Sequence, residues 1–155
     1  MATTTAYAIR GLLATAVRGI TPALYGVGFL EHDNQSDFRD WCEKHASSSF
    51  RRFSVRERGV TEPALVSNND IEWRETDFEI LVAYPAGTRY GQGADVDMDR
   101  AMESDQDLIE TAIGIRGSIA NAAVIRAGTS AARESLNGVT LISIIQRMGH
   151  YRSFT

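Results

Sequence analysis

Apolar residues at helical spacing predict a helix close to the N-terminus. Its apolar stripe consists of Ile9, Leu12, Leu13, Ala16, Val17 and Ile20. Residues spaced in this way share one face of a helix, and a threonine among residues 3–5 can cap the first turn. The helix is expected to end at Thr21, because a residue that precedes proline is pushed out of the α region. The apolar segment 23–30 is predicted as a short strand or an ordered connection.

Two further helices are predicted, one short and one long. The short helix covers residues 37–45 and is broken by a run of serines at 47–49. The long helix covers residues 96–115. Its apolar face is formed by Met98, Ala101, Met102, Leu108, Ile109, Ala112 and Ile113. Asp105 falls on the same face and is its one acidic residue, so it is expected to be solvated or to pair with a nearby arginine.

Alternating apolar and polar residues predict the strands. These strands cover residues 50–56, 71–84, 122–126 and 139–148. Strand 71–84 is the clearest, because its apolar side chains alternate with polar ones. Its side chains that share one face are Phe78, Ile80, Val82 and Tyr84. The pair Asn137-Gly138 before the last strand is a strong turn signal, and residues 149–155 follow that strand as an aromatic and basic tail.

The order of these elements predicts an α+β fold in a single domain over residues 1–155. Strands 50–56 and 71–84 are expected to pair antiparallel, as are strands 122–126 and 139–148. The two main helices would then pack on one face of a mostly antiparallel, four-stranded sheet. The short helix 37–45 is expected as an insertion into this arrangement.

Composition restricts the partners of the chain. Its net charge of -4 argues against a protein that binds nucleic acid in bulk, although DNA could pass through a pore formed by several copies. Lys44 is the only lysine, so nearly all positive charge is arginine. Arginine pairs well with carboxylates across interfaces, while a coding sequence rich in G and C would produce the same bias.

No apolar run approaches the roughly 20 residues of a membrane span, and residues 1–7 carry no secretory pattern.

One pair of residues suggests catalysis or metal binding. Cys42 and His45 are three positions apart on the short helix and therefore share a face. They could form a thiolate–imidazole pair or half of a metal site. A zinc site needs three or four ligands, and no second Cys/His pair exists. Cys42 as a core residue and His45 as a helix end explain the pattern more simply. We therefore expect no catalytic residue, no metal and no cofactor.

The glycine-rich segment 86–94 is predicted as a flexible loop. It lacks the Gly-Lys-Ser/Thr sequence of a phosphate-binding loop. Asp95, Asp97 and Asp99 follow it and alternate like the first ligands of a calcium loop, but the glycine and glutamate of that motif are missing. Their position in the first turn of a helix, where the helix dipole favours negative charge, explains them better.

The order of elements resembles that of the tail terminator proteins of long-tailed, siphovirus-like bacteriophages. The matching segments are the amphipathic helix 6–20, the strand 51–55, the long strand 73–84 ending in Tyr84-Pro85, the helix 97–115 and the strand 141–145. The resemblance covers most of the chain. The inserted segment 29–49 is longer than expected for this family.

The resemblance implies a structural virion protein. Its members form a ring, usually a homohexamer, that caps the tail tube, stops its polymerisation and provides the joint to the head connector. The implied partners are further copies of the chain, the tail tube protein and the connector or stopper protein, with DNA only passing through the lumen. No enzyme activity, cofactor or membrane is implied. The expected location is the tail or neck of a virion assembled in the host cytoplasm.

Physical reasoning adds candidate interface residues that the resemblance does not specify. The residues predicted to contact a neighbouring subunit or the tube are Arg51, Arg52, Arg56, Arg89, Tyr90, Asp95, Asp97 and Asp99. The arginines would pair with the aspartates of the next copy, and the tyrosine would anchor the tube contact. Three alternatives stay open: another head–tail joining protein, a small cytosolic enzyme that uses Cys42 and His45, and a ligand-binding module with the glycine loop as a lid.

Overall fold

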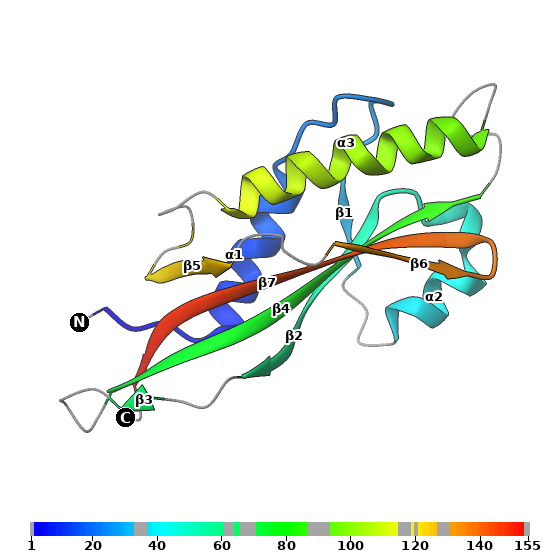
Figure 1. The fold of residues 1–155 in the computed structure, drawn as a ribbon. Coiled ribbons are helices and arrows are strands. Elements are labelled where there is room, and N and C mark those ends of the chain that lie inside the picture. The colour runs from blue at the N-terminus through cyan, green and yellow to red at the C-terminus, as the bar shows by residue number, and fades with distance from the viewer. Residues whose placement is uncertain are drawn as a thin grey trace.

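The computed structural model describes residues 2–32, 37–60, 64–65, 71–86, 94–114, 119, 121–126 and 131–153. Within these ranges the chain forms three α-helices, one 3-10 helix and seven strands (Figure 1). The helices are α1 (Ala6–Arg18), α2 (Phe38–Lys44) and α3 (Ala94–Gly114), and the 3-10 helix η1 is Ala46–Ser48. The strands are β1 (Leu30–Glu31), β2 (Arg52–Val60), β3 (Ala64–Leu65), β4 (Ile71–Pro85), β5 (Ala122–Arg126), β6 (Ala132–Leu136) and β7 (Val139–Ser153). The predicted α+β class is confirmed.

The strands form one mixed sheet in the order β1-β2-β4-β7-β5, with β3 added beside β4 and β6 beside β7. The predicted number of four strands was therefore wrong, although the sheet is mostly antiparallel as predicted. The additional strands are β1, which runs parallel to β2, and the short edge strands β3 and β6. Both predicted pairings are confirmed, since β2 pairs antiparallel with β4 and β5 pairs antiparallel with β7.

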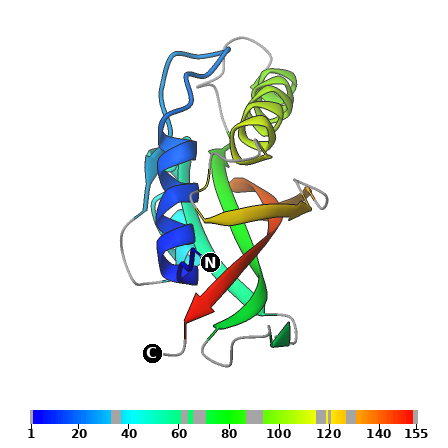
Figure 2. The same cartoon turned by 90° about the vertical axis from the view of Figure 1, so that its left-hand side faces the viewer.

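The centre of the sheet is the antiparallel pair β4 and β7. All fifteen residues of each strand are in register, from Ile71 opposite Ser153 to Pro85 opposite Val139. At the usual rise per residue this ribbon is roughly 50 Å long, and Figure 2 shows its strong twist. The prediction ended the last strand at residue 148 and described residues 149–155 as a tail. The strand instead continues to Ser153, because the equally long β4 supplies hydrogen-bonding partners along its whole length.

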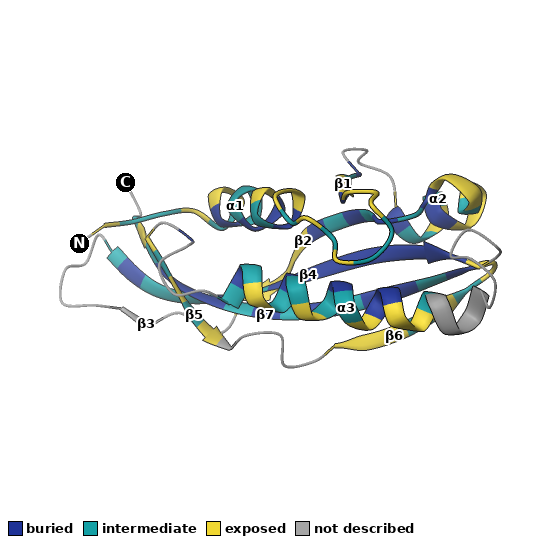
Figure 3. Cartoon of the chain, turned by 90° about the horizontal axis from the view of Figure 1, so that it is seen from above, coloured by how far each residue is buried: buried dark blue, intermediate teal, exposed yellow. Residues whose placement is uncertain are grey.

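The two faces of the sheet carry separate hydrophobic clusters. On one face, α1 and α3 share a core with the sheet, as predicted for the two main helices. The side chains of this larger cluster include Ile9, Leu13 and Val17 of α1, Met102, Ile109 and Ile113 of α3, Phe78, Ile80 and Val82 of β4, and Ile142 and Ile144 of β7. On the other face, α2 packs through Phe38 and Cys42 on Leu81, Ala83, Val139 and Leu141. The inserted helix therefore covers only one end of its face (Figure 3).

Local signals explain where several elements begin. Thr5 caps α1 by accepting a hydrogen bond from the backbone N–H of Ala8 at 3.1 Å. Asp37 caps α2 through the N–H of Arg39 at 3.0 Å. The turn predicted at Asn137-Gly138 joins β6 to β7, with Gly138 at a φ of 78°. Strand β6 itself was missed, because its polar, largely exposed sequence has no apolar alternation.

Candidate functional site

Arg51 lies at the centre of the most elaborate polar network in the described structure. Its side chain is fully buried, and its Nε donates to Oδ2 of Asp105 at 2.7 Å while Nη2 donates to Oδ1 at 3.0 Å. The hydroxyl of Tyr84 donates to the same Oδ2 at 2.6 Å. The guanidinium lies over the rings of Phe50 and Phe29, 4.8 and 5.6 Å from their centroids. The charge is thus balanced by a carboxylate and enclosed by aromatic faces.

The same guanidinium also binds the connection between α1 and β1. Nη2 donates to the backbone carbonyl of Leu24 at 2.6 Å, and Nη1 donates to the carbonyls of Val27, at 2.6 Å, and Tyr25. Of the two alternatives predicted for residues 23–30, the ordered connection is therefore confirmed, with only Leu30 in β1. Carbonyl groups of this connection accept hydrogen bonds from the Arg51 side chain in place of a neighbouring strand.

A strained backbone turns Arg51 inward. Arg51 has a φ of 55°, in the left-handed region that non-glycine residues rarely adopt. This conformation interrupts the predicted strand 50–56, so β2 begins only at Arg52. The network around Arg51 supplies the interactions that offset this strain. This network joins β2, β4 and α3 to the connection between α1 and β1, residues 19–29, which we call the 19–29 connection. Arg51 therefore holds the fold together.

Arg51 is consequently not available to a neighbouring copy, and its predicted role at a subunit interface is corrected. The remaining predicted arginines of β2 lie closer to the surface. Arg52 is half-buried with its guanidinium 5.0 Å from the centre of the Trp41 ring, whereas Arg56 is exposed. Asp99 is exposed at α3 and pairs with Arg133 of the same chain at 2.8 Å. Arg89 and Tyr90 lie outside the described residues, as do the side chains of Asp95 and Asp97.

Charged residues occupy the part of the sheet face next to α2. Arg147 binds Asp77 through two hydrogen bonds, from Nε to Oδ1 at 2.8 Å and from Nη2 to Oδ2 at 3.1 Å. Glu79 lies 3.8 Å from nitrogens of both Arg39 and Arg58. Within the described part of the chain, the exposed arginines Arg56 and Arg58 of β2 thus have at most a distant carboxylate partner on this face.

The environment of Cys42 does not suit a nucleophile. Its side chain is fully buried in the smaller cluster. Burial raises the pKa of the Cys42 thiol to about 12, and the nearby charge of Arg52 lowers it only in part. His45 ends α2, is exposed, and stacks on Trp41 at 4.9 Å with its Nδ1 3.1 Å from the Trp41 carbonyl. A thiol with this pKa stays protonated near neutral pH, which counts against a Cys42–His45 catalytic pair.

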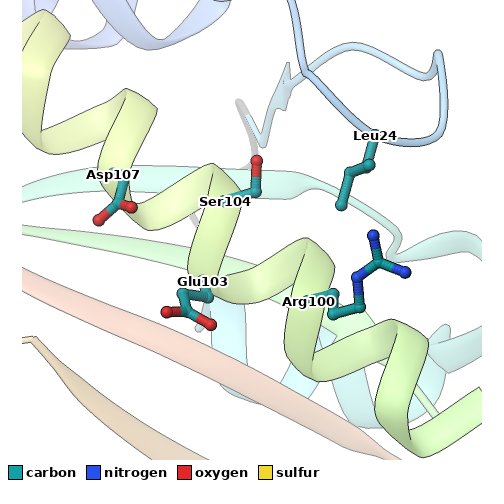
Figure 4. A pocket seen from close by; sticks show the side chains of 5 residues that line it. All are labelled: Leu24, Arg100, Glu103, Ser104 and Asp107. Atoms are coloured by element: carbon teal, nitrogen blue, oxygen red, sulfur yellow. The ribbon is translucent and has the colours of Figure 1, made fainter.

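A cleft of about 310 Å³ opens between the 19–29 connection and α3. Its lining residues are Leu24, Arg100, Glu103, Ser104 and Asp107. Figure 4 shows Leu24 on the connection facing the helix, with the Arg100 guanidinium close to it and the two carboxylates further along the helix. Both walls are fixed from beneath by Arg51, which binds the Leu24 carbonyl on one side and Asp105 on the other.

The acidic residues of the cleft belong to a longer stripe. Asp99, Glu103, Asp107 and Glu110 recur at spacings of four, four and three residues, which places them on one face of α3. The first three are exposed. Like charges at this spacing destabilise an isolated helix by about 0.2–0.5 kcal/mol per pair. The acidic stripe is already visible in the spacing of the sequence, although only its first residue, Asp99, was predicted as an interface residue.

No family model and no curated protein matches the chain. Within the described ranges, no helix has both the length and the apolar character needed to cross a membrane. The described histidine, cysteine and acidic side chains also form no group of three or more suited to a metal ion. The function is therefore inferred from the fold and from the charged surfaces of the chain.

Proposed function

We propose that the chain is a structural subunit of a ring that caps a phage tail tube, stops its polymerisation and connects it to the head. Support comes first from the order of elements on which the resemblance rests. The amphipathic α1, the strand β2, the long strand β4 ending at Pro85, the helix α3 and the long β7 follow in the required sequence. The mechanism is steric and electrostatic, since one face of the ring would fit the tube and the other would not.

The observation that carries the proposal is the separation of opposite charges on one subunit. The exposed charges of α3 are mostly acidic, with Arg100 as the exception, while those of the exposed half of β2 are the two arginines Arg56 and Arg58 with Glu57 between them. In Figure 1, α3 lies along the top of the molecule and the end of β2 at the bottom, with β4 and β7 between them. Two different, complementary patches produce a head-to-tail contact, which closes into a ring if the rotation between copies allows it.

The first test is the mass of the purified protein in solution, measured by light scattering after gel filtration, with negative-stain images of any large species. We expect a particle of about six subunits with a central hole. Such rings can also close only on the tube, so a monomeric protein is next mixed with assembled tail tube. A chain that stays monomeric and leaves tube growth unchanged would refute the proposal. Binding to a portal or adaptor ring in place of the tube would identify a head–tail joining protein.

A further inference from the structure

The cleft between the 19–29 connection and α3 has a chemical character that none of the predicted interface residues captures. One wall is the apolar side chain of Leu24, and the floor is a helix that presents Glu103 and Asp107 one turn apart. Arg100 lies at the Leu24 end, so the opposite end is the acidic one (Figure 4). An arginine side chain fits this combination, because its stem is apolar and its planar head pairs with carboxylates.

The walls of the cleft are held rigidly by the buried network. The Leu24 carbonyl accepts from Nη2 of Arg51 at 2.6 Å, and the same nitrogen donates to Asp105 of α3 at 3.0 Å. Little ordering of the loop is therefore needed when a partner enters, and such preorganisation lowers the entropy cost of binding. This distinguishes the cleft from the rest of the acidic stripe on α3.

The chain itself carries a complementary surface on its far side. The last five residues of β2, from Arg56 to Val60, are all exposed. Arg58 has a side chain that is 56% exposed, and among the described residues its ion pair is the long one to Glu79, at 3.8 Å. An arginine with so weak a partner can exchange it for a better one without leaving a buried charge unpaired.

We infer that the cleft beside α3 receives the arginines of β2, Arg56 and Arg58, from a second copy of this chain. The inference rests on the ring proposed above and specifies the contact between its neighbouring subunits. Leu24 packs on the apolar stem of an arginine that enters the cleft. Glu103 and Asp107 bind the guanidinium of that arginine. Because the two surfaces are different and lie on opposite sides of the subunit, each copy can use both at once.

The test is a charge exchange between two variants. The first is Glu103→Arg with Asp107→Arg, and the second is Arg56→Glu with Arg58→Glu. Each variant alone presents two surfaces of the same sign and should require at least about tenfold more protein to assemble than the wild type. An equimolar mixture restores opposite charges at every contact if the copies alternate, so assembly should return to the wild-type range. Native mass spectrometry would show both variants in one particle.

The matched control is Asp40→Arg with Glu43→Arg, two exposed residues of α2 that lie away from the cleft. It changes the net charge by the same amount as the first variant and should assemble like the wild type. Circular dichroism and thermal unfolding check that every variant is folded. Wild-type-like assembly of either variant alone, or a mixture that stays unassembled, would refute the cleft contact and leave the ring in place. A wild-type chain that forms no assembly, alone or on tail tube, would refute both.

Discussion

Nε of Arg51 donates to Oδ2 of Asp105 at 2.7 Å, and neither side chain is exposed to solvent. The two residues come from separate elements, the turn before β2 and the middle of α3. Their pairing explains two features that are otherwise costly, an acidic residue on the apolar face of a helix and an arginine at a positive φ. Each charge is stable inside the protein because the other is present.

We predict that Asp105→Ala lowers the free energy of unfolding by about 3–5 kcal/mol, because it leaves the Arg51 charge buried without a carboxylate. Chemical denaturation followed by circular dichroism measures the change. Asp99→Ala is the control, since it removes an ion pair whose side chains are 44% and 63% exposed, and it should change stability by no more than about 1 kcal/mol. Equal effects of the two substitutions would contradict the central role of the buried pair.

Arg51→Lys tests the geometry of the network separately from its charge. Lysine keeps the positive charge but cannot bind Asp105 through two nitrogens while also reaching the carbonyls of Leu24 and Val27. We expect a loss of stability and faster hydrogen exchange near the 19–29 connection. Hydrogen exchange followed by mass spectrometry locates the effect. Protection that decreases evenly over the whole chain would show that Arg51 does not hold this connection in particular.

Gly149 of β7 is required by close packing. A Cβ at this position would collide with the ring of Trp73 and come within 2.9 Å of Cδ1 of Ile125. Gly149→Ala should therefore destabilise the protein by about 1–3 kcal/mol, as overpacking does. Gly59→Ala in β2 is the matched control, because a Cβ there meets nothing within 4 Å. Thermal melts of the two variants should shift by clearly different amounts, and equal shifts would contradict the packing seen at Trp73.

The single thiol offers a direct probe of the smaller hydrophobic cluster. Cys42 is buried and its pKa is raised to about 12, so little thiolate is present at pH 8. Alkylation by iodoacetamide should be slow in the native protein and become fast in denaturant, as followed by the mass of the product. Val60→Cys, at a position that is 41% exposed, supplies an accessible thiol for comparison. Rapid native alkylation of Cys42 would revive the catalytic interpretation.

Local patterns predicted most of the fold. The apolar spacing in α1 and α3 and the alternation in β4 identified the elements and their buried faces, because both signals depend only on neighbouring residues. The sequence could not reveal that β4 and β7 pair over fifteen residues. That pairing joins segments more than fifty positions apart, and residues 149–153 show strand character only beside their partner. The edge strand β6 was missed for a different reason, because its polar and largely exposed sequence shows no apolar alternation.

The candidate site was harder to predict than the fold. Arg51 was grouped with Arg52 and Arg56 because all three are arginines of one predicted strand, whereas its side chain is fully buried and its backbone has a positive φ. Asp105 was recognisable as an unusual residue on the apolar face, and the expected pairing with an arginine is confirmed. Which arginine it meets depends on how α3 packs against the turn before β2. The partner of Asp105 is thus determined by tertiary contacts, and these leave no local pattern in the sequence.

His150 links the N-terminal segment to the sheet and makes stability depend on pH. The ring is almost completely buried, with Nδ1 3.2 Å from the carbonyl oxygen of Thr4 and Nε2 3.1 Å from the hydroxyl of Thr76. A carbonyl only accepts, so Nδ1 carries the proton and the Thr76 hydroxyl can donate to Nε2. Burial lowers the pKa of His150 below its ordinary value of 6.5, more than the Thr4 bond raises it. Positive Arg74 adds to the lowering, and negative Glu57 opposes it.

The sign of the pH effect follows from these pKa values. Well above pH 6.5 the imidazole is neutral in both the folded and the unfolded chain and contributes no pH dependence. Below that value the unfolded chain binds a proton that the folded chain excludes, so the free energy of unfolding decreases with falling pH until the lowered pKa is passed. His150→Gln keeps a neutral polar side chain and removes this titration. Urea unfolding between pH 8 and pH 5 should therefore show a steeper loss of stability below pH 6.5 in the wild type than in the variant. Parallel curves would mean that His150 does not titrate differently on folding, and that the N-terminal segment is held without regard to its protonation.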